Sequence, residues 1–316
     1  MKNLKKLTKT VTAVILGAAL LTGCGSKEDV KTANAQVPAE NRNAAVTTAS
    51  AENSSLEAAS LEEGKSEGAG VTEPVTVKLG VVGENNEQWE PVIEALAKEN
   101  ITLELVKFSD YSLPNQALAD GEIDLNSFQH YAYLNNEIAD KGLDLTVIGE
   151  TIIAPLGLYS DKISDVSELK EGDKIAIPSD ATNGGRALKV LEAAGVITVD
   201  QEAGYTPVLS DITDNPLNLE FIEVEAANTP SLLPDVAAAI INGGHAVDNG
   251  LFPEEDAVYL ETVQEGSDNP YINIVVARTA DKDNGIYKRV VEEYRTEAVA
   301  KVIEEVYKGA YIPTWE

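Results

Sequence analysis

The sequence has very little of the residue types that support disulfide scaffolds and metal sites. Cys24 is the only cysteine in 316 residues, so no disulfide can form within the chain and a hydrophobic core has to hold the fold together. The only two histidines, His130 and His245, are 115 positions apart, and no cysteine cluster accompanies them. We therefore expect no metal and no other cofactor; only a fold that joined both histidines would allow a metal to bind.

Basic residues are also scarce, with 24 lysines and arginines against 53 acidic residues and a formal net charge of −29. A surface of this charge repels nucleic acid and anionic lipid, which makes both poor direct partners of the folded part. The same charge favours solubility and a monomeric state, and it indicates no particular fold. We expect a monomer with no nucleic-acid partner.

Motifs of common enzyme classes are missing as well. The chain has no Gly-x-Ser-x-Gly elbow and no His-Glu-x-x-His pair. Aspartate and glutamate are so frequent that a pair of carboxylates is uninformative. We therefore expect a protein that is not an enzyme. The alternative is an exported hydrolase of small amino-acid conjugates, which His130 and the many acidic residues suggest.

Residues 1–23 have the pattern of a secretory signal peptide. Four lysines and no acidic residue occur among the first nine positions, and residues 11–21 are apolar except for one threonine. This apolar run is shorter than the roughly 20 residues that a membrane-spanning helix needs. We therefore predict a segment that is cleaved on export.

Cys24 stands directly after this segment, in the sequence Leu-Thr-Gly-Cys. The ending resembles a bacterial lipoprotein signal, which implies cleavage before Cys24 and diacylation of its thiol. Two or more acyl chains give durable anchoring. We expect a protein that is held by lipid on the extracytoplasmic face of the cell membrane, and an ordinary signal peptide with an accidental cysteine is the alternative.

The composition changes after Cys24. Residues 25–74 are rich in alanine, serine, glutamate, asparagine and threonine and contain no aromatic residue, so they lack the apolar surface that an ordered structure requires. We predict a flexible tether over 24–74, with a root-mean-square span of roughly 40 Å on flexible-linker statistics. The folded part then starts at residue 75 and is long enough for two α/β lobes.

The folded part alternates strand and helix patterns. Residues 75–82 and 101–108 are apolar, β-branched runs with an amphipathic helix pattern between them, which is typical of a βαβ unit. Further strands are predicted at 123–126, 145–153, 174–178, 219–224, 236–241 and 272–277. This alternation predicts largely parallel sheets. The last helical pattern, from about residue 286 to Gly309, is interrupted at Thr296.

Polar and aromatic residues concentrate at the predicted strand ends, where ligands of parallel α/β proteins bind. In the first such segment, residues 126–134, Phe128, His130 and Tyr133 follow a strand and open a helix. So many polar groups are unusual in a core, so we interpret the segment as a binding surface. A structural role for a lone histidine is the alternative.

The second segment, residues 178–186, follows the strand at 174–178 and ends with Arg186, directly after a Gly-Gly pair. Backbone amides beside glycine can approach a ligand closely, and a guanidinium can bind a carboxylate through two parallel hydrogen bonds. We expect Arg186 to bind an anionic group, with Asn183 of the same segment close by. A surface salt bridge is the alternative, whereas a phosphate loop is disfavoured because the Gly-Lys-Ser/Thr ending is missing.

The third segment, residues 237–245, is an apolar strand followed by Asn242, two glycines and His245. The Asn242 amide can accept a hydrogen bond from an ammonium group and donate one to a carboxylate. Asparagine before glycine also forms turns without any ligand, so a purely structural turn is the alternative.

These segments resemble the methionine-binding lipoprotein family, the substrate-binding proteins of methionine ABC importers. The resemblance runs from about residue 75 to the C-terminus and is carried by residues 108–115, 124–130, 178–186, 241–242 and 269–273. It implies a two-lobed α/β fold of the periplasmic-binding-protein type II, with the ligand cleft between the lobes. It also implies ligand contacts from Arg186, Asn242, Asn183, Tyr111, Phe128, His130 and Tyr133.

The resemblance further implies a function and a domain organisation. The expected function is to capture L- or D-methionine and deliver it to a membrane permease driven by an ATPase. We expect residues 75–154 and 251–316 in one lobe and residues 155–250 in the other. Ala154 and the Gly-Gly-His sequence at 243–245 depart from the family pattern, so another small apolar amino acid or a methionine dipeptide is the alternative ligand.

Overall fold

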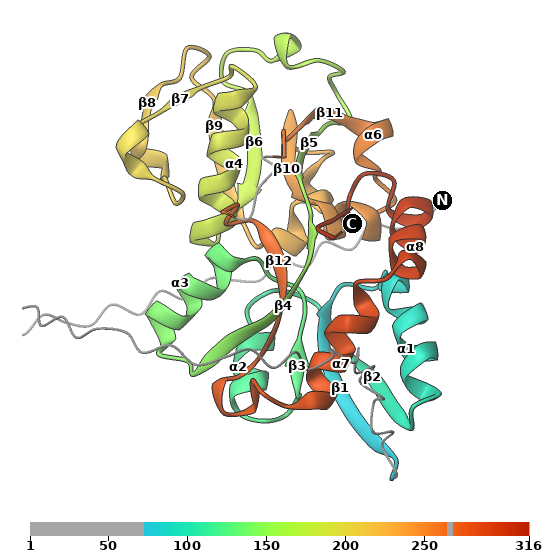
Figure 1. Ribbon diagram of the computed structural model, residues 1–316. Helices are drawn as coiled ribbons and strands as arrows, with labels where there is room; N and C mark the ends of the chain where they lie inside the picture. The colour runs from blue at the N-terminus through green and yellow to red at the C-terminus, as the bar shows by residue number, and fades with distance from the viewer. Residues whose placement is uncertain (1–72, 264–267, 316) are drawn as a thin grey trace, which may run out of the picture. The chain divides into compact units, whose positions relative to one another are not determined.

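The computed structural model describes residues 73–263 and 268–315. The expected signal peptide, the expected lipidation site Cys24 and the tether up to residue 72 lie outside these residues. The described chain forms two β-sheets with helices around them (Figure 1).

The first sheet contains six strands in the order β13-β4-β12-β3-β1-β2. Their bounds are β1 Val75–Val82, β2 Ile101–Phe108, β3 Leu125–Asn126, β4 Leu145–Ile153, β12 Ile272–Arg278 and β13 Ile312–Pro313. β1 pairs in parallel with β2, with Val75 opposite Ile101. The βαβ unit that the sequence predicts at 75–108 is confirmed.

The second sheet contains five strands in the order β11-β5-β10-β6-β9. Their bounds are β5 Leu156–Tyr159, β6 Lys174–Pro178, β9 Glu220–Val224, β10 Ala238–Asn242 and β11 Ala257–Leu260. A separate two-stranded sheet joins β7 Thr198–Val199 to β8 Ile212–Asp214. In Figure 1 the second sheet occupies the upper half of the folded part and the first sheet the lower half.

The prediction of largely parallel sheets is wrong, because both sheets are mixed. β1 is parallel to β2 and β3, and β6 is parallel to β9 and β10. β4, β12 and β13 pair antiparallel in the first sheet, and β5 and β11 pair antiparallel in the second. The antiparallel strands flank the two passages of the chain between the sheets, where the direction of the chain reverses.

The chain passes from the first sheet to the second at Ala154 and Pro155, between β4 and β5. It returns between β11 and β12, because β11 pairs with β5 and extends the second sheet to Leu260. A strand as short as β11 has too weak a pattern to be recognised before its partner is known.

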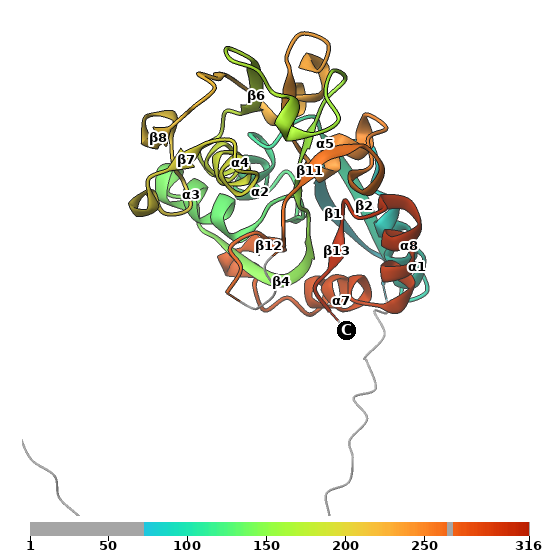
Figure 2. The ribbon, with the colours of Figure 1, turned by 90° about the horizontal axis from the view of Figure 1, so that it is seen from above.

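Helices cover both sheets. Their bounds are α1 Glu90–Ala97, α2 Pro114–Ala119, α3 Tyr131–Lys141, α4 Ala181–Ala193, α5 Gly243–Asp248, α6 Pro253–Asp256, α7 Gly285–Tyr294 and α8 Glu297–Tyr307. Figure 2 shows α1, α7 and α8 together on one flank of the first sheet. The break between α7 and α8 falls at Thr296, as the sequence predicts.

Each sheet has its own hydrophobic core. In the first, the buried Trp89 packs against Tyr294 of α7, with ring centroids 4.4 Å apart. In the second, Leu188 and Leu191 of α4 pack on the apolar strands β6 and β10. Burial of such side chains stabilises each half by about 1.5–3 kcal/mol per large residue. The two cores make each half a lobe with its own packing.

Candidate ligand-binding site

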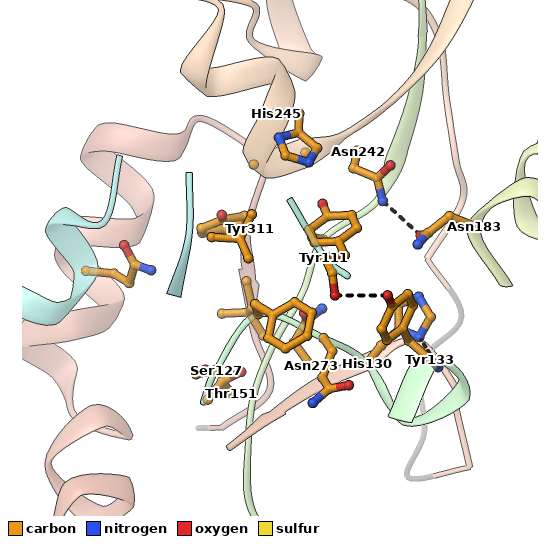
Figure 3. A pocket seen from close by; sticks show the side chains of 18 of the residues that line it. Tyr111, Ser127, His130, Tyr133, Thr151, Asn183, Asn242, His245, Asn273 and Tyr311 are labelled. Carbon is orange, nitrogen blue, oxygen red and sulfur yellow. Dashed lines mark hydrogen bonds between the residues drawn. The ribbon is translucent and has the colours of Figure 1, made fainter. Parts of the chain in front are cut away.

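A cavity of about 770 Å³, counting the part that opens to solvent, contains the site. All seven residues for which the sequence predicts ligand contact line it: Tyr111, Phe128, His130, Tyr133, Asn183, Arg186 and Asn242. The first four come from the half of the molecule built on the first sheet, and the last three from the half built on the second. The structure thus brings the three predicted strand-end segments together around one space (Figure 3).

Aromatic rings form one wall of the cavity. The ring of Tyr111 lies 5.9 Å from that of Phe128 and 6.1 Å from that of Tyr133, and Phe128 and Tyr133 are 5.9 Å apart. The Tyr133 hydroxyl donates a hydrogen bond to the backbone carbonyl of Tyr111 at 3.0 Å. The imidazole of His245 packs against Tyr111 at a tilt of 36°, with ring centroids 4.9 Å apart. These contacts fix the rings in place without a ligand.

His130 precedes α3 as its N-cap residue, and its side chain is 5% exposed. The backbone N–H of Tyr133 donates to His130 Nδ1 at 3.1 Å. A neutral imidazole that accepts at Nδ1 carries its proton on Nε2. His130 Nε2 is buried and has no hydrogen-bond partner among the described residues, so it provides a donor for a ligand.

The charge state of His130 agrees with this assignment. Burial, together with the positive charge of Arg186, lowers the pKa of His130 to about 3. The imidazole is therefore neutral at any physiological pH. It therefore adds no charge to the cavity.

Arg186 lies on α4 and is only 2% exposed, so the surface salt bridge considered for it is excluded. The guanidinium instead forms a buried pair with Glu261, with Nε to Oε1 at 2.8 Å and Nη2 to Oε2 at 2.6 Å. Nη2 also donates to the carbonyl of Ala154 at 3.1 Å, and the ring of Tyr271 lies 4.1 Å from Cζ. The third guanidinium nitrogen, Nη1, takes part in none of these hydrogen bonds within the described chain. The Nη1 edge of the guanidinium can therefore bind a carboxylate.

Two side chains, Asp180 and Asn183, orient the Asn242 amide. The Asp180 carboxylate accepts from Nδ2 of Asn183 at 3.0 and 3.1 Å, because a carboxylate can only accept. Asn183 therefore turns its Oδ1 toward Asn242, whose Nδ2 donates to it at 2.8 Å. This contact is drawn in Figure 3. Asn242 Oδ1 is left buried and unpartnered within the described part of the chain.

Asn242 donates one Nδ2 hydrogen to Asn183 Oδ1, and its own Oδ1 is free to act as an acceptor within the described residues. The Gly184-Gly185 pair serves packing rather than ligand approach. A Cβ on Gly184 would lie 2.7 Å from the carbonyl oxygen of Pro178, and one on Gly185 would lie 2.7 Å from Cα of Thr206.

A buried amide cluster supports the aromatic wall. Asn115 and Gln129 exchange hydrogen bonds at 2.8 and 2.6 Å, and Asn126 joins both of them. All three side chains are at most 2% exposed. Because a fully satisfied polar network has few alternative arrangements, it holds the loop that carries Phe128 and His130.

Several lining residues were not predicted from the sequence. They are Val82, Asn86, Gln88, Thr151, Ile152, Tyr294 and Tyr311, with Asn273 of a segment for which no role was predicted. Ser127 and Gln129 also line the cavity and belong to the segment that was predicted as a binding surface. Ala154 and residues 243–245, where the chain departs from the family pattern, also line the cavity.

Two mixed sheets, joined by two passages of the chain and enclosing a cavity with unpartnered polar atoms, define a two-lobed binding protein of the periplasmic type. The chain belongs to the NlpA lipoprotein family, whose model matches residues 77–315.

Relatives and solved structures agree with this assignment. A protein of Vibrio cholerae named probable D-methionine-binding lipoprotein MetQ is 40% identical over 241 residues, which cover 76% of this chain and 88% of the relative. A nutrient-binding protein of Burkholderia cenocepacia, solved bound to methionine, is 36% identical and covers 76% of this chain and all of its own, with a TM-score of 0.72. The substrate-binding protein of a methionine transporter from Streptococcus pneumoniae, also 36% identical, covers 76% and 96%, with a TM-score of 0.71.

Within residues 73–263 and 268–315, no helix is long and apolar enough to cross a bilayer. The same residues contain no group of three or more histidine, cysteine, aspartate or glutamate side chains placed to hold a metal ion.

Proposed function

We propose that the protein captures methionine outside the cytoplasm and delivers it to an ABC import permease and its ATPase, while lipid on Cys24 anchors it to the membrane. Membership of the NlpA lipoprotein family and the likeness to methionine-binding proteins support this function. The observation that carries it is a cavity that combines an aromatic wall with an unpartnered buried donor and acceptor.

The polar atoms suit the head group of a free amino acid. We infer that the ligand carboxylate binds to Nη1 of Arg186 and to the Nε2–H of His130, and that the ligand ammonium donates to Asn242 Oδ1. A zwitterion loses much hydration on burial, and charge-assisted hydrogen bonds offset that loss. The cavity contains buried polar atoms without a protein partner in the described chain, so a ligand that pairs them offsets the cost of their burial.

The aromatic wall suits the thioether. A sulfur atom against aromatic rings contributes about 0.3–1.5 kcal/mol, so Tyr111, Phe128 and Tyr133 favour methionine over a chain that lacks sulfur. They also tolerate other unbranched apolar side chains. A different small apolar amino acid or a methionine dipeptide is accordingly the alternative ligand.

The two lobes would act by closing on the ligand. In our proposal, residues 75–154 and the chain from β12 onward form one lobe, and residues 155–260 form the other. Since the expected ligand contacts come from both halves, bound ligand favours the closed arrangement, which then docks on the permease. We propose that capture proceeds without chemical turnover.

Calorimetry on ligand-stripped protein tests this function. Methionine should bind with one site per chain and be recovered unaltered by mass spectrometry. Arg186→Ala should weaken binding by about 2–5 kcal/mol, the usual cost of removing one partner of a buried charge pair. Arg289→Ala, on α7 and paired with Glu99, is the matched control and should bind like the wild type.

The choice of ligands separates the alternatives. L-methionine, D-methionine, norleucine and a methionyl dipeptide should be compared in the same titration. If norleucine or the dipeptide bound more tightly than methionine, that compound would take the place of methionine as the proposed ligand. Product released in excess of the protein would identify a hydrolase instead.

A further inference from the structure

Glu261 is the one acidic side chain that bonds directly to Arg186 in the described chain, and it follows β11 in the passage between the lobes. Its side chain is 16% exposed, and that of Arg186 is 3% exposed. Besides Arg186, its Oε2 accepts from the backbone N–H of Leu156 at 2.8 Å. Glu261 does not itself line the cavity in the described chain.

The bond pattern determines which edge of Arg186 faces the ligand. Glu261 takes the Nε and Nη2 edge, and Ala154 takes a second bond from Nη2. A bidentate grip on a ligand carboxylate through this edge is therefore impossible while Glu261 is in place. Only the Nη1 edge of the guanidinium is left for a ligand.

Among the described residues, Arg186 is the only lysine or arginine that lines the cavity, and its charge is already paired. Arg186 and Glu261 form a pair with no net formal charge, and His130 is neutral because burial lowers its pKa to about 3. The Asp180 carboxylate lies at the N-terminus of α4, where it accepts from the backbone N–H of Asn183 and faces the positive end of the helix dipole. The remaining polar contact, Asn242, is an uncharged amide.

A site whose one cationic side chain is already paired penalises a ligand that brings only a carboxylate, because that charge loses its hydration without full compensation. We propose that Glu261 is a specificity-determining residue: by neutralising and orienting Arg186, it makes the site select ligands with both an ammonium and a carboxylate over carboxylates that lack the ammonium. This inference rests on the proposed capture of methionine and deepens it.

The test compares methionine with 4-(methylthio)butanoate, which has the same chain and carboxylate but no ammonium. The measured quantity is the ratio of the two dissociation constants, from calorimetry, in wild type and in Glu261→Gln. Glutamine keeps the size of the side chain and removes the charge. The site then carries an uncompensated positive charge, and the preference for methionine should fall by about tenfold or more, in line with the coupling of close charge pairs.

Two further variants separate charge from shape. Glu150→Gln removes a carboxylate of β4 that accepts from Tyr131 of α3 and does not line the cavity in the described chain, and it should leave the ratio unchanged. Glu261→Asp keeps the charge in a shorter side chain. It should stay within about threefold of the wild-type ratio, even if both ligands bind more weakly.

An unchanged ratio in Glu261→Gln would overturn the proposal, as would a fall in Glu261→Asp as large as the one expected for Glu261→Gln. If thermal melting shows that Glu261→Gln does not fold, the Glu261→Asp result alone decides. Failure of the proposed function is distinct, because the wild-type protein would then bind no methionine. In that case the inference about Glu261 falls with it.

Discussion

The orientation of Asn242 leads to a prediction that isolates one hydrogen bond. Its Oδ1 is buried and unpartnered in the described chain, and Asn183 holds its Nδ2 at 2.8 Å. Because Asp180 fixes Asn183 in turn, the oxygen cannot exchange places with the nitrogen. We expect this oxygen to accept a hydrogen bond from the ammonium group of the ligand.

The magnitude follows from the type of bond. A hydrogen bond to a charged group contributes about 1.5–3 kcal/mol, which corresponds to roughly 10- to 150-fold in affinity. Asn242→Ala should weaken methionine binding by this amount. It should weaken binding of 4-(methylthio)butanoate much less, because that ligand has no ammonium group that could donate a hydrogen bond to Asn242.

The assay is a cycle of two proteins and two ligands, measured by calorimetry at one pH and salt concentration. The difference between the two ligand effects gives the coupling between Asn242 and the ammonium, free of general damage to the site. Asn249→Ala is the matched control, because Asn249 donates to the carbonyl of His245 and does not line the cavity. A coupling below about 0.5 kcal/mol would refute the assigned orientation, since it would fall below the contribution of even a neutral hydrogen bond.

Three other predictions concern backbone fit, pH and anchoring. Gly83 has φ +87°, and a Cβ built there would lie only 2.2 Å from Asp248 Oδ2. Gly121 has a similar φ of +78°, but open space surrounds it. Gly121→Ala should lower the free energy of unfolding by about 1–2 kcal/mol. Gly83→Ala should lower it by more and should also weaken binding. Equal losses for the two variants in chemical denaturation would argue against a clash with Asp248. Burial lowers the pKa of His130 to about 3, so unfolding below about pH 6.5 takes up a proton at this residue. His130 should therefore lower the free energy of unfolding by about 1.4 kcal/mol for each pH unit that the pH falls. His130→Gln should flatten that dependence in urea titrations, and an identical slope would contradict the assignment. Cys24→Ser should release the protein from the membrane fraction, and retention there would disprove anchoring through the thiol.

The strands that were predicted well are long and clearly bounded. β1, β2, β4 and β6 begin and end where the apolar, β-branched runs do. The four-residue strands β5 and β11 were not predicted as separate strands. They exist through pairing with each other and with β10, which is a tertiary contact that local propensity does not record.

The composition of the candidate site was predictable because its chemistry gathers at strand ends. Phe128, His130, Arg186 and Asn242 stand in short polar segments after apolar strands, and such segments meet where two sheets face each other. All four line one cavity. Their contacts with a ligand stay predictions.

The sequence by itself determined the long strands and the helices beside them, the segments that carry polar and aromatic groups, and the family resemblance. Tertiary structure alone decided what those groups present to a ligand. Glu261, 75 positions from Arg186, takes one edge of the guanidinium, and Asp180 acts through Asn183 to turn the oxygen of Asn242 toward the cavity. The physical reason is that a hydrogen bond depends on direction and on which atoms are already paired. Those pairings exist only when the lobes are folded.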